Sequence, residues 1–236
     1  MQPQAVIFDV FGTCVDWRSG VASVALEFFR ARSIEIDPIA FADAWRAQYQ
    51  PAMAVIRAGD RGYVDLDVLH RENLDRVLTA NGLADQLGED DRNRLNHAWE
   101  KLPAWPDVVP GLTAIRDHAI IAPCSNGSIA LMTRLARFAG LPWDCILGAP
   151  IARNYKPQPV VYLQSCAALR LDPSEVMMVA AHNDDLAAAR KAGLMTGFVA
   201  RPTEHGEAQT SDLGPAGDWD VVADDFVALA DAIFER

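Results

Sequence analysis

The stretch of sequence that decides the fold is AVIFDVFGT, residues 5–13. Its first four residues are all apolar, which is typical of a strand buried on both faces in a parallel sheet. Asp9 follows directly, at the carboxyl end of that strand, where ligands bind in open α/β sheets. An aspartate at this place is a candidate nucleophile, and its plainer interpretation is a turn residue.

Phe11 stands two residues after Asp9, and its ring can neither give nor take a proton. An enzyme that transfers phosphoryl groups with this motif would keep a second aspartate there to protonate the leaving group. Thr13, four residues after Asp9, can hydrogen-bond the aspartate or cap the following turn. The stretch therefore favours chemistry that begins with attack by Asp9 and needs no acid beside it.

The composition is that of a folded protein with a large core. Of the 236 residues, 50% are hydrophobic and 22% are charged, which is enough for one domain with an insertion or for two domains. The formal charge of −11 disfavours nonspecific binding to nucleic acids or to anionic membranes. An anionic substrate would need a local positive pocket.

The sequence signals neither export nor membrane insertion. No basic segment followed by an apolar stretch stands at the start, and no apolar run is long enough to span a bilayer, so we expect a cytoplasmic protein. The four cysteines are far apart and lack the spacing of metal ligands: Cys14, Cys124, Cys145 and Cys166. We expect them to be reduced thiols, mostly buried.

The pattern along the chain predicts a helical segment followed by alternating strands and helices. Apolar residues recur at three- and four-residue spacing in residues 21–31, 39–56, 64–78 and 90–102. Short apolar runs that read as strands follow at residues 119–122, 145–147, 176–179 and 196–199. The polar residues 203–219 are expected to form a long surface loop.

These patterns predict an α/β fold, a doubly wound parallel sheet with an inserted all-helical cap. The core would consist of residues 1–16 and 104–236, and the cap of residues 17–103. The cap would leave the core directly after the first strand. Ligands would then bind at the carboxyl ends of the strands, facing the cap.

Two later strands end in polar residues that are candidates for the same site. Ser125 and Asn126 follow the second strand and open a helix, where they either cap the helix or help to bind an anion. Lys156 precedes a proline, which favours an extended backbone and leaves its ammonium able to reach sideways. It is either a solvated surface residue or the ion partner that lowers the pKa of Asp9.

The last strand runs into VAAHNDDL, residues 179–186, before an alanine-rich helix. Asp185 would lie at the helix N-terminus, where an acid can simply complement the helix dipole. His182 is a possible water-orienting partner or general base, and equally a structural hydrogen-bonding residue.

Taken in order, these four motifs resemble those of the haloacid dehalogenase superfamily, with its Rossmann-like core and cap. Phe11 resembles the aromatic residue of the carbon–halogen-cleaving branch, the type II (S)-2-haloacid dehalogenases. The resemblance implies that Asp9 is the nucleophile, that Lys156 is its ion partner and that Asp185 orients Lys156 and a hydrolytic water. The implied catalytic residues are Asp9, Thr13, Lys156, His182 and Asp185.

The same resemblance implies a set of substrate-binding residues: Phe11, Arg46, Ser125, Asn126 and Tyr162. Arg46 resembles the family's cap arginine, which engages the departing halide or the substrate carboxylate. Tyr162 resembles a tyrosine near the family's active site, and as an alternative it packs inside a helix. The aromatic residues Trp17, Trp45 and Tyr49 are candidates for lining an apolar pocket or for core packing.

Two departures from family patterns bear on metal and water. Metal-dependent phosphatases of the superfamily carry two acids four residues apart in the last motif, whereas this chain has Ala181 at the earlier place. We therefore predict no metal, and the implied reaction needs no organic cofactor. The best-known dehalogenases carry Ser and Asn where this chain has Ala180 and His182, so His182 is a candidate to replace them in handling water.

The implied activity is hydrolysis of short 2-haloalkanoic acids to 2-hydroxy acids through an ester on Asp9, with halide as the other product. The segments Trp17-Arg18 and Ala180-Ala181-His182 look more like a divergent subgroup that includes fluoroacetate-acting members, so fluoroacetate is a candidate substrate. Two alternatives are a Mg²⁺-dependent phosphatase or phosphonatase, and a binding protein that retains the fold without turnover. An apolar cap helix is compatible with a homodimer.

Overall fold

The computed structural model describes residues 2–234 and contains one six-stranded parallel sheet. The strand order is β3-β2-β1-β4-β5-β6, so β1 (Ala5–Phe8) lies between β2 (Ile120–Ser125) and β4 (Val176–Ala180). Phe8 pairs with Val179, which brings the carboxyl ends of β1 and β4 together. The chain order reverses direction at β1, and such a switch point opens a crevice in a doubly wound sheet. The predicted α/β fold is confirmed.

The two edge strands are short. They are β3 (Leu147–Gly148) and β6 (Val221–Ala223), and β5 (Met195–Val199) lies between β4 and β6. The sequence pattern did not predict β6, because it has three residues and its central Val222 is 46% exposed on the sheet edge. A run that short carries no usable alternation.

Alternate residues of β1 face opposite layers of helices. Val6 and Phe8 belong to a core with α6 (Val108–Arg116), α7 (Ile129–Ala139) and α11 (Phe226–Phe234). Ala5 and Ile7 belong to a second core. That core contains α9 (Pro159–Leu169) and α10 (Asn183–Lys191), and the short α8 (Ala149–Ala152) lies at its edge. A strand with helices on both faces is apolar at every position, as β1 is.

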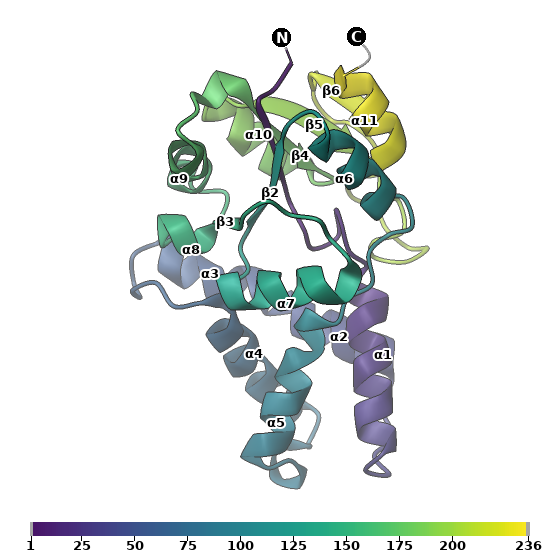
Figure 1. The fold of residues 1–236 in the computed structure, drawn as a ribbon. Coiled ribbons are helices and arrows are strands. Elements are labelled where there is room, and N and C mark those ends of the chain that lie inside the picture. The colour runs from purple at the N-terminus through teal and green to yellow at the C-terminus, as the bar shows by residue number, and fades with distance from the viewer. Residues whose placement is uncertain (1, 235–236) are drawn as a thin grey trace.

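The described residues between β1 and α6 contain only helices and loops. The α-helices are α1 (Trp17–Arg30), α2 (Pro38–Ala47), α3 (Tyr49–Arg57), α4 (Leu66–Ala80) and α5 (Glu89–Asn96). Figure 1 shows them gathered at one end of the molecule, below the sheet. We propose that they form a cap domain, residues 17–103, on a core of residues 1–16 and 104–236.

Two details differ from the sequence predictions. The helical pattern of residues 39–56 is divided, because α2 ends at Ala47 and α3 begins at Tyr49. Pro51 has no N–H to donate to the carbonyl of Ala47, so one continuous helix would lose a hydrogen bond there. The prediction of a surface loop for residues 203–219 is wrong at Glu204, which is only 2% exposed.

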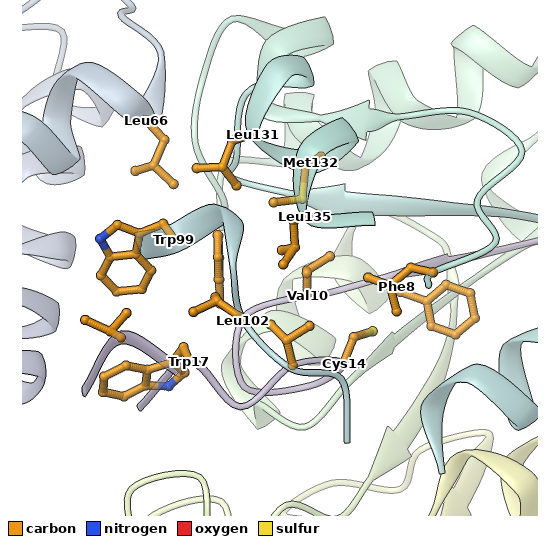
Figure 2. Packing of buried hydrophobic residues seen from close by; sticks show 14 of the residues in the cluster. Phe8, Val10, Cys14, Trp17, Leu66, Trp99, Leu102, Leu131, Met132 and Leu135 are labelled. Carbon is orange, nitrogen blue, oxygen red and sulfur yellow. The ribbon is translucent and has the colours of Figure 1, made fainter. Parts of the chain in front are cut away.

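A buried cluster joins the cap to the sheet. In Figure 2, Trp17 and Trp99 lie toward the cap, Leu131 and Met132 come from α7, and Phe8 comes from β1. The rings of Trp17 and Trp99 stack with their centres 6.3 Å apart. Packing of this kind holds the cap helices firmly over the carboxyl edge of the sheet.

Two further observations concern the cysteines and the length of the helices. All four cysteines are free thiols, three of them buried and Cys145 partly so. Among the described residues, no helix is both long enough and apolar enough to cross a membrane.

Candidate active site

Asp9, Lys156, His182 and Asp185 meet at the carboxyl edge of the sheet. Asp9 follows β1, while His182 and Asp185 follow β4, the strand beside it. Lys156 lies in the loop between α8 and α9. The four side chains line a cleft of about 580 Å³. Residues of α2 and α3 form its opposite wall, so the site lies between the sheet edge and the helical region.

The Asp9 carboxylate contacts three polar side chains. The Thr13 hydroxyl donates to Oδ2 at 2.7 Å, and Lys156 Nζ donates to Oδ1 at 2.9 Å. The Nδ1 atom of His182 lies 3.1 Å from Oδ2. Thr13 is itself held in place, because its Oγ1 accepts the N–H of Ala181 at 3.0 Å. Both carboxylate oxygens of Asp9 are therefore oriented.

The charges of Asp9 and Lys156 are set by burial and by their neighbours. Burial raises the pKa of Asp9, but the Lys156 ammonium and the His182 ring outweigh it and hold that pKa well below its usual range. Burial lowers the pKa of Lys156, but the carboxylates of Asp185 and Asp9 outweigh burial and hold that pKa above its usual range. At neutral pH Asp9 is an anion and Lys156 a cation. An ionised carboxylate with little access to water can act as a nucleophile.

Asp185 is held from two sides. Lys156 Nζ donates to its Oδ2, and the hydroxyl of Tyr162 donates to its Oδ1. Burial raises the pKa of Asp185; the Lys156 ammonium opposes this and the Asp9 carboxylate adds to it, leaving the pKa raised. Burial also raises the pKa of Tyr162, and the Asp185 charge adds to that effect, so the phenol keeps its proton. Tyr162 does not line the cleft and supports Asp185 from behind.

His182 lies between two carboxylates. Its Nδ1 faces Asp9, and its Nε2 lies 2.8 Å from Oε2 of Glu204. Burial lowers the pKa of His182, but the Glu204 charge and the hydrogen bonds to both acids raise it well above its usual value. In the free protein the imidazole is therefore a cation that bridges Asp9 and Glu204.

Glu204 is a site residue that the sequence did not predict. It lies in the loop between β5 and β6, and its Oε1 accepts the indole N–H of Trp17 at 2.8 Å. Gly12 lies against it: a Cβ at Gly12, where φ is +90°, would fall 2.1 Å from Oε1. The only signal in the sequence is position, because the loop after β5 starts at the same sheet edge as Asp9.

Arg46 projects from α2 into the cleft among aromatic rings. Its guanidinium carbon lies 4.0 Å from the ring centre of Tyr49, 5.2 Å from that of Trp17 and 5.9 Å from that of Phe11. Its Nη1 atom is buried and has no hydrogen-bond partner among the described residues. A buried cationic N–H without a partner is costly, so an anion at this place would be bound well.

Ser125 and Asn126 differ in what they face. The Asn126 side chain lines the cleft and its Oδ1 accepts the N–H of Lys156 at 2.8 Å. The Ser125 hydroxyl is fully buried, accepts the N–H of Gly127 at 3.1 Å and does not line the cleft. Asn126 thus holds the backbone that carries the lysine, while Ser125 shapes the turn after β2.

Phe11 lines the cleft and packs edge-on against two cap rings. Its ring centre lies 5.8 Å from that of Trp99 and 6.3 Å from that of His70. His70 is buried, stacks on Trp99 at 4.3 Å, and neither ring nitrogen has a hydrogen-bond partner among the described residues. Burial lowers the pKa of His70 well below its usual value, so this ring is neutral. The part of the cleft wall that Phe11 forms is apolar.

The cap is hydrogen-bonded to the segment that carries the lysine. Arg57, at the end of α3, donates from Nη1 to the carbonyl of Lys156 at 3.0 Å. The Tyr155 hydroxyl donates to the carbonyl of Val64 at 2.7 Å. These bonds tie α3 and the start of the α4 region to the two residues on which the position of the ammonium depends.

The donor set does not fit a hard divalent cation. Within residues 2–234, no group of three or more His, Cys, Asp or Glu side chains is arranged to hold a metal ion. Phe11 and Ala181 supply no oxygen where an acid would be required, and the Lys156 ammonium already occupies the space between Asp9 and Asp185.

The comparisons with known proteins agree with this fold and site. A model of the family described as haloacid dehalogenase-like hydrolase matches residues 3–193. The chain therefore belongs to the haloacid dehalogenase-like hydrolases.

Within that family, the chain is similar to characterised dehalogenases along almost its full length. It is 50% identical to the defluorinating L-2-haloacid dehalogenase Rha0230, with 97% of this chain and 94% of that one covered and a TM-score of 0.95. It is 43% identical to the L-2-haloacid dehalogenase PA0810, with 99% and 100% covered and a TM-score of 0.96. The (S)-2-haloacid dehalogenase 4A of Burkholderia cepacia is 29% identical, with 90% of this chain and 94% of the relative covered.

Proposed function

We propose that this protein hydrolyses short L-2-haloalkanoates to 2-hydroxy acids and halide, with Asp9 as the nucleophile. The observation that carries the proposal is the buried, ionised Asp9 beside Lys156, facing a cleft that holds Phe11 and an Arg46 N–H without a partner among residues 2–234. An anionic nucleophile opposite a cationic, partly apolar wall fits displacement of a halide. The similar dehalogenases support the same reaction.

In the first half of the reaction, a carboxylate oxygen of Asp9 attacks C2 of the substrate from the side opposite the halide. The carbon–halogen bond breaks, the halide takes the bonding electrons, and an ester forms on Asp9 with inversion at C2. Arg46 would stabilise the charge that develops on the halide, and the rings of Phe11 and Tyr49 would exclude water around it.

The substrate carboxylate needs donors of its own. Asn126 lines the cleft beside Lys156, and we propose that it holds this group together with backbone N–H groups of the turn that leads to α7. Ser125 would act on the substrate only through the turn that it shapes, because its hydroxyl is engaged with Gly127.

In the second half, water attacks the carbonyl carbon of the Asp9 ester and releases the 2-hydroxy acid. Lys156 contacts one oxygen of that carboxyl group and His182 the other, while Asp185 contacts Lys156, and we propose that these three residues orient the water. The oxygen in the product then derives from Asp9, which water restores.

The rival activity in the same family is Mg²⁺-dependent hydrolysis of phosphate esters. It requires an acid near Phe11 and a second carboxylate where Ala181 stands. The donor set argues against it, and so does the apolar packing of Phe11.

The test is halide release by the purified protein in EDTA, from fluoroacetate, chloroacetate and each enantiomer of 2-chloropropionate. We expect release from the L enantiomer and its loss in Asp9→Asn. A phosphate ester with Mg²⁺ serves as the parallel assay. Phosphate release without halide release would overturn the proposal. A homodimer is a separate proposal, tested by light scattering of the same preparation.

A further inference from the structure

We propose that Glu204 is a positioning residue for His182, and that this pair activates the hydrolytic water only after Asp9 has become an ester. The inference rests on the proposed function, because it concerns the second half of that reaction. It assigns a role to a residue that no sequence motif marks and gives His182 a different task from that of Asp185.

The geometry fixes which nitrogen of His182 faces the ester. Glu204 is 2% exposed and is itself anchored by the Trp17 indole N–H, so its Oε2 is a fixed acceptor 2.8 Å from Nε2. An ionised carboxylate there requires a proton on Nε2. Nδ1 therefore points at Asp9, from 3.1 Å, and it is the nitrogen that can exchange a proton at that carboxyl group.

The charges around His182 change during the cycle. Asp9 and Glu204 contact the His182 ring directly. Lys156 contacts Asp9, whereas Arg46 and His205 act on the charge of Glu204, His205 from 3.6 Å. Three further acids line the cleft: Asp184, Asp185 and Asp212. Only Asp9 loses its charge when the ester forms. While Asp9 is ionised, its carboxylate stabilises the imidazolium; once it is esterified, that stabilisation is gone.

His182 can therefore act as a base only while Asp9 is an ester. In the free protein, the proton on Nδ1 is shared with Asp9, and His182 cannot accept another. After alkylation, the imidazolium faces an uncharged ester and loses its Nδ1 proton through the cleft, into which its partly exposed ring opens. Glu204 retains the proton on Nε2 and keeps the ring in place.

Water attacks the ester carbonyl carbon while His182 Nδ1 takes one of its protons, giving a tetrahedral intermediate. The bond from that carbon to the alkyl oxygen then breaks, and the leaving oxygen takes the proton of the new carboxylic acid. Asp9 returns as a carboxylate beside a protonated His182. Over the whole cycle, one water is consumed, and one halide, one 2-hydroxy acid and one proton are released.

The experiment separates the two half-reactions in Glu204→Gln, which keeps the shape of the side chain and removes its charge. L-2-chloropropionate is mixed with excess enzyme, and halide and intact protein mass are followed in quenched samples. We expect one halide per substrate molecule at a near-normal rate, followed by an accumulated adduct on Asp9. Ester hydrolysis should slow by roughly 10- to 100-fold, because the loss of the Glu204 charge removes part of the rate enhancement that a general base provides.

The matched control is Glu207→Gln, an exposed acid in the same loop, which should leave both half-reactions unchanged. If Glu204→Gln hydrolyses the ester at the wild-type rate and no adduct accumulates on Asp9, the inference is overturned. An equal loss of alkylation and hydrolysis, which a merely structural role would give, would also overturn it. Absence of halide release from the wild-type protein would instead count against the proposed function.

A second measurement takes its pH profile from the wild-type protein and uses a variant only for comparison. In the wild-type protein, the rate of ester hydrolysis in single turnovers is followed against pH. We expect it to rise with pH to a plateau as His182 loses its proton in the ester state, while the alkylation rate does not follow that profile. Loss of the rising limb in His182→Asn would support the inference, and its persistence in that variant would contradict it.

Discussion

Lys156 Nζ lies 2.9 Å from Asp9 Oδ1 and binds Asp185 with the same ammonium group. One cation thus contacts two buried acids that follow neighbouring strands. This lysine is an electrostatic requirement of the fold as well as part of its chemistry, because its loss would deprive both buried carboxylates of the ammonium that they share.

Lys156→Met should reverse the pH dependence of stability in the weakly acidic range. In the wild type, the lowered pKa of Asp9 stabilises the fold above about pH 4 and this contribution is lost as pH falls. Without the ammonium, burial raises the pKa of both acids, so stability should fall as pH rises from 4 to 7. The loss at pH 7 should be about 3–5 kcal/mol.

Urea denaturation at a series of pH values measures this, with the exposed Lys191→Met as the control. Halide release should be lost in the first variant only. Parallel pH curves for Lys156→Met and the wild type would contradict the prediction.

His182→Gln should cost most stability in acid. The folded pKa of His182 lies above its usual value, so its contribution is complete below about pH 6.5 and is lost as pH rises through the raised pKa. The difference in unfolding free energy between wild type and variant should shrink toward alkaline pH. A difference that grows with pH would show that the imidazole is neutral in the free protein. His97→Gln, at a half-exposed ring, is the control.

Arg46→Lys should reduce the rate of halide release by about 100-fold, the usual cost of losing one donor to a developing anion. A lysine cannot retain both the stacking on Tyr49 and the N–H that has no partner in the described structure. The loss should be larger with fluoroacetate than with chloroacetate, because fluoride is the poorer leaving group. Arg71→Lys, in a surface ion pair of the cap, is the matched control. Equal losses for both halides would mean that Arg46 binds the substrate carboxylate.

His70→Phe should leave the melting temperature unchanged or raise it. Both ring nitrogens of His70 are buried and lack a partner among the described residues, and a phenyl ring retains the stacking on Trp99. Thermal unfolding measures the stability and halide release the activity, which should persist. A stable variant without activity would show that a His70 nitrogen contacts the substrate.

The sequence was sufficient where the chemistry follows regular strands. Asp9, Asn126 and Asp185 were found because the carboxyl ends of parallel strands share one edge, and a buried apolar run marks each strand. The position of Lys156 followed from the same rule and from its proline.

The features that were missed depend on long-range packing. Glu204 lies in an irregular polar loop, and its burial depends on a hydrogen bond to Trp17, distant in the chain. The pattern of residues 39–56 has the helical period, and only the missing N–H of Pro51 divides it. The spacing of apolar residues indicates which face of a helix or strand is buried. It does not indicate which loop, such as that of Glu204, packs against the active site.

The hydrogen bond from Arg57 to the carbonyl of Lys156 has a consequence for protein engineering. A cap helix holds the backbone of Lys156, the residue that keeps Asp9 ionised. The cap is therefore not an interchangeable module. A chimaera that takes its cap from another family member would change the substrate pocket and also release the lysine segment. Transplanting specificity into this scaffold therefore requires the new cap to retain Arg57, and also a backbone carbonyl at the place of Val64 that accepts from Tyr155 of the core.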